Sequence, residues 1–170
     1  MSRRLAALMA LMALSVAISL SGCAAEGPAS FGGGEGAQCS PVADGGRILF
    51  GDVLGSPPSG GLEVLGVSLD DPHDVRLVHA YLIPIYPSTG IYGIGSATVP
   101  PDVYIPGWDE RVDAAGSEVA AGDIGGVVVE VERTSEQPGT FAAIRVDYRV
   151  GRNTFSKPAT TTYELRDRCF

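Results

Sequence analysis

The sequence predicts an all-β domain, an antiparallel β-sandwich of six to eight short strands, on three observations. Short apolar runs separated by turn-forming residues fill the chain from residue 39 onward. Glycine occurs 23 times and proline 12 times in 170 residues, and only 19% of the residues are charged. This composition favours turns and strands over long helices. No convincing amphipathic helical pattern follows the first 22 residues of the sequence.

The first element, residues 1–22, has the layout of a secretory signal peptide. Arg3 and Arg4 form a positively charged start, and residues 5–20 are apolar except for Ser15 and Ser19. This apolar run is short for a membrane-spanning helix, which needs about 20 apolar residues. A cleaved signal peptide is therefore the preferred interpretation, and a retained membrane anchor is the alternative.

The end of this segment, Leu20, Ser21, Gly22 and Cys23, resembles a bacterial lipobox. In such signals the Cys is diacylated and the chain is then cut before it. We therefore expect Cys23 to carry acyl chains such as palmitate, which anchor a protein firmly when two or more are present. The predicted location is the extracytoplasmic face of the cell membrane, held by the lipid.

The charge balance restricts the partners of the mature chain. Acidic residues outnumber basic residues by 20 to 12, which gives a formal net charge of −8. Loss of the two signal-peptide arginines takes this value to −10 (−8 − 2). Proteins that bind nucleic acid need clustered Lys and Arg, so we exclude nucleic acid as a partner.

The next element, residues 23–38, is predicted to be the lipidated Cys followed by a flexible tether. Residues 24–38 contain five glycines and almost no large apolar side chain, which is typical of a linker. We expect a single domain over residues 39–170.

Two cysteines, Cys39 and Cys169, remain once Cys23 carries lipid. In an exported domain such a pair most often forms a disulfide, which here would join the two ends of the domain. A redox pair or a two-thiol metal site is the alternative interpretation. The sequence has no C-x-x-C motif and no His near either Cys, so we prefer the structural disulfide.

The strands of the domain follow from alternating apolar residues between turn signals. Val127, Val129 and Val131 are expected on one strand face, and Leu65, Val67 and Leu69 on another. The second and third strands are expected to pair as a hairpin across the turn 70–74. The expected strands cover residues 47–54, 62–69, 75–85, 126–133, 140–150 and 154–169.

Three segments carry a family resemblance: residues 62–85, residues 116–133, and residues 146–155 with the late Cys169. In these segments the chain resembles small exported lipoproteins of high-GC Gram-positive (actinobacterial) bacteria that carry an immunoglobulin-like domain. The resemblance implies an immunoglobulin-like β-sandwich of about seven strands and a lipid-anchored location. It implies no activity and no functional residues.

The sequence offers little for catalysis. The stretch 93–97 comes nearest to a G-x-S-x-G motif but lacks the closing Gly, and there is no P-loop. His79 is expected on a strand face with Tyr81 and Ile83, and also with Val75 and Leu77, where a His is usually a packing residue. We predict that the chain is not an enzyme and that it uses no cofactor.

The turn 70–74 holds four potential metal ligands, Asp70, Asp71, His73 and Asp74. Carboxylates suit calcium, and an added His suits zinc or copper. A turn this short can direct only some of these side chains at one ion. A solvated turn is therefore preferred, and an extracytoplasmic lipoprotein that binds a metal or a small ligand is the alternative function.

Residues 86–115 are rich in Pro and Gly and show no apolar period. Tyr92, Tyr104 and Trp108 are predicted to form a recognition loop, because rigid aromatic rings provide contact area at low entropic cost. The alternative is that Trp108 folds back and plugs one end of the sandwich. We expect a non-catalytic binding or scaffolding module whose partner is an envelope protein or the cell wall.

Overall fold

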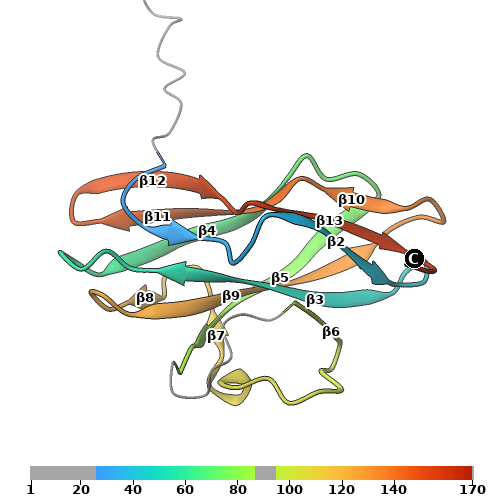
Figure 1. The fold of residues 1–170 in the computed structure, drawn as a ribbon, viewed down its shortest axis with the longest axis horizontal. Helices are drawn as coiled ribbons and strands as arrows, with labels where there is room; N and C mark the ends of the chain where they lie inside the picture. The colour runs from blue at the N-terminus through green and yellow to red at the C-terminus, as the bar shows by residue number, and fades with distance from the viewer. Residues whose placement is uncertain (1–25, 87–94, 170) are drawn as a thin grey trace, which may run out of the picture.

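The structure, a computed structural model, describes residues 26–86 and 95–169. These residues form two layers of β-sheet that pack face to face (Figure 1). Within these two ranges, thirteen strands are accompanied by a single 3-10 turn, η2 (Trp108–Glu110). The all-β sandwich prediction is confirmed, although eight strands of six or more residues are present instead of about seven.

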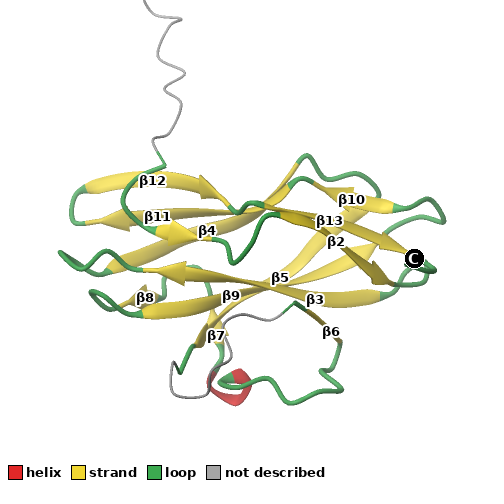
Figure 2. Ribbon diagram, viewed as in Figure 1, coloured by secondary structure: helices red, strands yellow, loops and turns green. Residues whose placement is uncertain are grey.

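The first layer is one sheet with the order β1-β3-β9-β5-β7, in which β6 also pairs with β3 (Figure 2). β9 lies at its centre, because Val127, Val129 and Val131 alternate toward the core as expected and are fully buried. The strands are β1 (Ser30–Phe31), β3 (Arg47–Gly55), β5 (Val75–Pro84), β6 (Ser96–Thr98), β7 (Val112–Asp113) and β9 (Ile124–Arg133).

The second layer consists of two smaller sheets. One has the order β12-β11-β4-β8 and the other β10-β13-β2. A long hairpin links them, since β11 pairs with β12 and β10 pairs with β13. The strands are β2 (Gly36–Pro41), β4 (Leu62–Asp70), β8 (Glu118–Val119), β10 (Gly139–Phe141), β11 (Ala143–Val150), β12 (Asn153–Pro158) and β13 (Thr161–Arg166).

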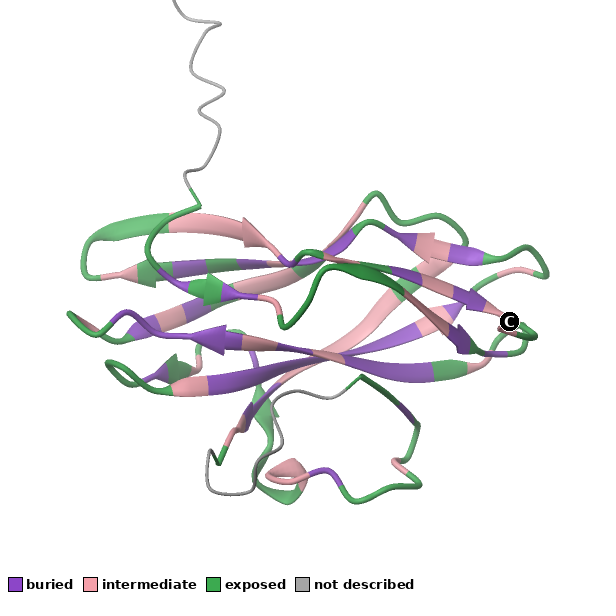
Figure 3. Cartoon of the chain, in the orientation of Figure 1, coloured by how far each residue is buried: buried purple, intermediate pink, exposed green. Residues whose placement is uncertain are grey.

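The core lies between the two layers, where the buried residues of facing strands meet (Figure 3). Phe50 of β3 contacts Tyr163 of β13 at 4.8 Å between ring centroids, and Phe141 of β10 stacks on Tyr163 at 4.4 Å. Ile144, Val146 and Tyr148 of β11 are also fully buried. Packing of such side chains is the main favourable term in folding.

The terminal strands are joined by the predicted disulfide. β2 and β13 run parallel to each other, and Cys39 is bonded to Cys169 with 5.8 Å between their Cα atoms. Nearby, the guanidinium of Arg133 is 2% exposed and donates hydrogen bonds to the carbonyl of Val42 and to the carboxylate of Asp167. This end of the sandwich is therefore closed by both covalent and polar contacts.

The expected hairpin between residues 62–69 and 75–85 is wrong. β4 pairs with β11 in the second layer, whereas β5 pairs with β9 in the first. The connection crosses between the layers with Asp71 and Asp74 at positive φ, 47° and 51°. His73 is tied by two backbone hydrogen bonds to Thr140, so the connection is held by a distant strand. An alternating pattern reveals a strand but not its partner.

Two irregularities change which residues share a face. The β5–β9 register shifts between Leu77 and His79, so Leu77 packs into the core whereas His79 and Tyr81 lie on the outer face. The β11–β4 register shifts opposite Leu65, which is 38% exposed, while Val64 is buried. The expected single faces at Val75–Ile83 and at Leu65–Leu69 are therefore wrong, because a bulge reverses the alternation.

The predicted tether is also corrected in part. From Glu26 onward the chain belongs to the fold: Ala29 is 2% exposed, Phe31 is 6% exposed, and β1 pairs with β3. The hydroxyl of Tyr148 donates to the carbonyl of Glu26 at 2.6 Å and accepts from the amide of Ala29 at 3.1 Å. A glycine-rich segment is thus ordered by a side chain far away in the sequence.

The predicted signal peptide, the lipobox residues and Cys23 lie outside the described residues. Among the residues that are described, none of the helices has the length and apolar character needed to cross a membrane.

Candidate functional site

The first sheet carries a second apolar cluster on its outer face, in addition to the core on its inner face. Leu49 of β3, Ile83 of β5 and Val128 of β9 point away from the core and are almost fully buried. Ala97 and Ile105 cover them from a segment that we call the loop layer, residues 95–111. In Figure 1 the loop layer, with β6 and η2, lies on the side of the first sheet that faces away from the second layer.

Trp108 anchors the loop layer to the sheet. It is half-buried and packs against the second apolar cluster. Its ring meets Tyr81 edge-on at 5.4 Å between centroids, and the guanidinium of Arg111 lies 4.6 Å from its centroid. The structure therefore places Trp108 on the outer face of the first sheet, not at an end of the sandwich.

The exposed apolar residues of the loop layer lie beside this anchor. Tyr104 is 86% exposed and Val103 is 58% exposed. Val112, which follows the loop layer, is 51% exposed. Of the large hydrophobic residues exposed in the described ranges, all except Leu65 lie between residues 86 and 112. Tyr92, the third aromatic of the predicted recognition loop, lies outside the described residues.

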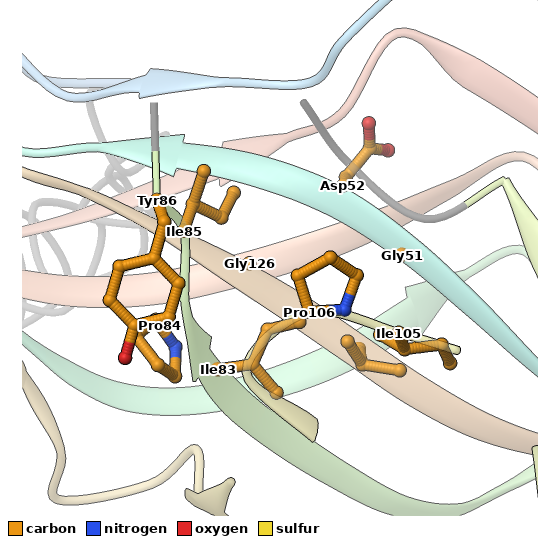
Figure 4. Close-up of a pocket in the computed structure, with 10 residues that line it drawn as sticks. Gly51, Asp52, Ile83, Pro84, Ile85, Tyr86, Ile105, Pro106 and Gly126 are labelled. Carbon is orange, nitrogen blue, oxygen red and sulfur yellow. The ribbon is translucent and has the colours of Figure 1, made fainter. Parts of the chain in front are cut away.

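A narrow apolar slot separates the loop layer from the end of β5 (Figure 4). It encloses about 330 Å³, part of it open to solvent. Gly126 belongs to its floor, where a Cβ atom would collide with the side chain of Ile83. The lining residues are Gly51, Asp52, Ile83, Pro84, Ile85, Tyr86, Ile105, Pro106, Gly126 and Val128.

The carboxylate of Asp52 belongs to the sandwich core and not to the slot. In Figure 4 it points away from the slot. One oxygen accepts from the amide of Gly33 and the other from the hydroxyl of Tyr163, both at 2.8 Å. Burial raises the pKa of Asp52, and burial together with the nearby Asp52 carboxylate raises the pKa of Tyr163. Asp52 thus joins the two layers.

A wider groove adjoins the slot and shares Ile83 and Pro84 with it. It encloses about 750 Å³, including space open to solvent. Three exposed acidic residues, Glu110, Glu118 and Asp123, stand around apolar side chains. The hydroxyl of Tyr86 donates to Glu110 at 2.7 and 2.8 Å, which raises the pKa of Tyr86. The apolar lining of the groove includes Leu82, Val112, Val119 and Ile124.

The rest of the outer face carries paired charges. Arg47 contacts Glu130 and Glu132 at 3.0 Å each, and Arg76 contacts Glu132 at 2.8 Å. The bond from Arg76 lowers the pKa of Glu132. Surface pairs of this kind contribute little to stability, typically about 0–1 kcal/mol each. This part of the outer face is therefore polar, and its charges are held in ion pairs.

The two histidines lie in different surroundings. Nε2 of His79 is 2.7 Å from the carboxylate of Asp113, and its ring lies over Tyr81. His73 contacts Asp71 at 3.2 Å, and both side chains are largely exposed. Each His thus contacts one carboxylate at the surface. In the sequence, His73 precedes the bulge of β5 and His79 lies directly after it.

The predicted metal turn does not converge on one point. The carboxylate of Asp70 is held by two bonds of 2.6 Å from Arg145, which directs it toward β11. Asp71 and His73 contact each other. Within the described residues, no group of three or more His, Cys, Asp or Glu side chains is placed to hold a metal ion. Asp74 has a positive φ and directly precedes β5 of the first layer.

Several site residues escaped the sequence analysis. The slot depends on Ile83, Ile105 and Val128, which looked like ordinary core residues. Glu118 and Asp123 border the groove although they are distant in sequence from Glu110. The one sequence signal for the slot is the group of prolines around it, because Pro84 and Pro106 interrupt regular pairing where the slot opens.

Comparisons with known proteins give no family assignment. No protein-family model matches the sequence, and no curated protein matches it. The fold is similar to part of the Vibrio cholerae VesB protease, with a TM-score of 0.41, 10% identity, and coverage of 81% of this chain and 31% of that one. It is also similar to part of a family 123 glycoside hydrolase from Clostridium perfringens, with a TM-score of 0.42 and 8% identity. That match covers 83% of this chain and 28% of the hydrolase, so this chain spans less than a third of either protein.

Proposed function

We propose that this chain is a lipid-anchored, extracytoplasmic binding or scaffolding module that catalyses no reaction and binds its partner through the loop layer. The observation that carries the proposal is the position of the exposed apolar residues. Tyr104 and Val103 stand on a segment that Trp108 fixes to the sheet. A rigid, exposed aromatic residue beside a groove is typical of a binding surface.

The surroundings of Tyr104 define the chemistry of the partner. The slot presents an aliphatic lining between Ile105 and Ile83, and the adjoining groove presents the carboxylates of Glu110, Glu118 and Asp123. We therefore expect an envelope protein or cell-wall component that presents an apolar group next to a basic group. Electrostatic complementarity of this kind mainly determines specificity and the rate of association.

A small apolar ligand in the slot is the second candidate function. The space that a water molecule can occupy in the slot is only about 20 Å³, far below the roughly 300–1,000 Å³ of small-molecule sites, so a ligand would fit only if the slot widened. The lining is mostly aliphatic, with Tyr86 as a polar group at its edge. The turn at Asp70–Asp74 gives no comparable support to metal binding.

The lipid anchor is tested separately from the binding surface. Intact mass of the protein extracted from its own membrane is expected to show a chain that begins at Cys23, carries acyl chains and is two hydrogens lighter than the reduced form. The C23A variant is expected to lose the acyl mass and to keep residues 1–22, because the chain is cut only after Cys23 is diacylated. An unacylated wild-type chain in the membrane fraction would contradict the anchor.

The binding surface is tested by photo-crosslinking in the native membrane. A benzophenone amino acid replaces Tyr104 in one variant and the exposed Thr154 of β12 in a matched control. We expect one discrete adduct from position 104 that is identified by mass spectrometry and is lost when Glu110 and Glu118 are changed to Gln. The proposal would be contradicted if position 104 gave no adduct, or if positions 104 and 154 gave the same adducts.

A further inference from the structure

We infer that the domain lies directly on the membrane with its β11–β12 hairpin against the lipid headgroups, so that the loop layer points away from the membrane. This inference rests on the proposed lipidation of Cys23. It replaces the predicted flexible tether by a short spacer that limits how the domain can turn.

The first step is the attachment of the N-terminal segment to the hairpin. Tyr148 of β11 holds the carbonyl of Glu26 and the amide of Ala29. Gly27, at φ 70°, packs so closely on Phe155 of β12 and on the Tyr148 hydroxyl that a side chain there would collide with both. The carboxylate of Glu26 also lies 3.8 Å from Nζ of Lys157. Glu26 is therefore fixed to the β11–β12 hairpin.

The second step is the length of chain between the lipid and this attachment. Glu26 lies three positions after Cys23 in the sequence. A fully extended chain spans at most about 3.6 Å per residue, so this spacer reaches roughly 11 Å in any conformation. A domain of residues 23–170 has a radius of gyration of roughly 15 Å by the size scaling of compact domains. The spacer is thus too short for the domain to turn over.

The third step is where the attachment lies. In Figure 1 the described chain begins beside β12, and the loop layer with η2 and β6 lies on the opposite side of the molecule. The two layers of the sandwich separate them. An anchor at Glu26 therefore brings the hairpin to the membrane and directs Tyr104 outward, toward a partner in the envelope.

The distribution of charge favours the same orientation. Residues 143–158 of the hairpin carry four basic side chains and one acidic side chain, a net charge of +3: Arg145, Arg149, Arg152, Lys157 and Asp147. Three of the basic side chains pair with Asp70, Glu63 and Glu26, which leaves the group neutral (+3 − 3). The loop layer, residues 95–111, has a net charge of −2, from Asp102, Asp109, Glu110 and Arg111. Anionic headgroups repel the loop layer more strongly than the hairpin.

The test uses the chain from Cys23 onward, in which Cys23 is the one thiol outside the disulfide. It is coupled to vesicles of phosphatidylcholine and phosphatidylglycerol that contain a maleimide lipid and a lipid with a nitroxide on its headgroup. Trp108, the only Trp of the chain, reports on the loop layer. The R152W variant adds a reporter on the turn between β11 and β12, and N153W adds one at the first residue of β12.

We expect the nitroxide to remove the emission that R152W adds and to leave the emission of Trp108 unchanged. Insertion of about 20 Gly/Ser residues before Glu26, which reach roughly 25 Å on average, should restore the quenched emission. Equal quenching at both positions, quenching that survives the insertion, or no quenching at either position would overturn the inference. Coupling through maleimide does not need acylation in the cell, so a failure of the proposed lipidation is recognised separately, by intact mass.

Discussion

The phenol of Tyr148 donates a 2.6 Å hydrogen bond to the carbonyl of Glu26, 122 residues earlier in the chain. The same oxygen accepts from the amide of Ala29 at 3.1 Å. Tyr148 is fully buried, so its hydroxyl closes the open edge of the sandwich at the point where the N-terminal segment crosses from β12 toward β3. This contact ties the N-terminal segment to β11.

The Y148F substitution is expected to destabilise the protein by about 1–3 kcal/mol, because it leaves the buried amide of Ala29 without its hydrogen-bond acceptor. Urea unfolding measures the loss, and hydrogen exchange at Ala29 should accelerate. Y104F is the matched control, since Tyr104 is 86% exposed and its substitution should change stability by less than about 0.5 kcal/mol. Equal effects of the two substitutions would show that the Tyr148 hydroxyl does not hold this segment.

Replacement of both Cys39 and Cys169 by Ser is expected to lower the free energy of unfolding by about 2–5 kcal/mol, because the bond restricts the unfolded chain. The bond closes a sequence separation of 130 residues and joins the neighbouring strands β2 and β13. Chemical unfolding of the oxidised protein, the reduced protein and the double variant checks this. The reduced protein and the double variant should agree; a double variant as stable as the oxidised protein would contradict it.

Trp108 and Tyr104 are expected to respond differently to replacement by Ala. W108A removes packing on Tyr81, Arg111 and the second apolar cluster, so it should cost about 1–3 kcal/mol, less than a fully buried Trp. Y104A should leave stability within about 0.5 kcal/mol, because this side chain is 86% exposed. Thermal unfolding compares the two variants. A stable W108A protein would mean that the loop layer does not depend on this ring.

Asp52 is expected to make stability depend on pH in an unusual direction. Burial raises its pKa above the ordinary value of 3.8, so the folded state binds this proton more tightly than the unfolded chain. Its contribution to stability is therefore present at low pH and is lost as the pH rises from about 3.8 through the folded pKa. The difference in the free energy of unfolding, wild type minus D52N, should therefore be greater at pH 4 than at pH 7.

Urea unfolding at the two pH values measures that difference. An Asn at this position retains an oxygen that can accept from Gly33 and an amide that can donate to the Tyr163 oxygen, so the contacts at 2.8 Å have replacements. A difference that is the same at both pH values would show that Asp52 has the same pKa in the folded protein as in the unfolded chain, and a difference greater at pH 7 would show that folding lowers its pKa. Either result would contradict the prediction.

Much of the local structure could be predicted from the sequence. The alternation of Val127, Val129 and Val131 predicted a strand with one face in the core, and β9 has that face fully buried. A strand was also expected over residues 140–150, and Ile144, Val146 and Tyr148 of β11 are fully buried. These predictions succeeded because the side chains of a strand point to alternate faces whatever its partner is. The disulfide followed from the number of cysteines and was confirmed.

Other features depended on contacts between distant parts of the chain. The pairing of β4 with β11, instead of β5, follows from the connection that crosses between the layers and binds Thr140. The bulge beside His79 reversed the faces of β5. The alternation of apolar residues in the sequence indicates neither feature, because packing across the whole sheet determines which strands pair.

The candidate site divides in the same way. The sequence by itself predicted an aromatic, proline-rich loop, and it determined the lipobox-like Leu20–Cys23 and the paired cysteines. Only the tertiary structure showed that the loop covers a second apolar face of the first sheet, with Trp108 packed and Tyr104 exposed. It also showed that Tyr148 fixes Glu26, so a glycine-rich segment that reads as a linker is ordered. The reason is physical: composition determines what a segment can bury or bond by itself, whereas its order here comes from a buried hydroxyl on a strand 122 residues away.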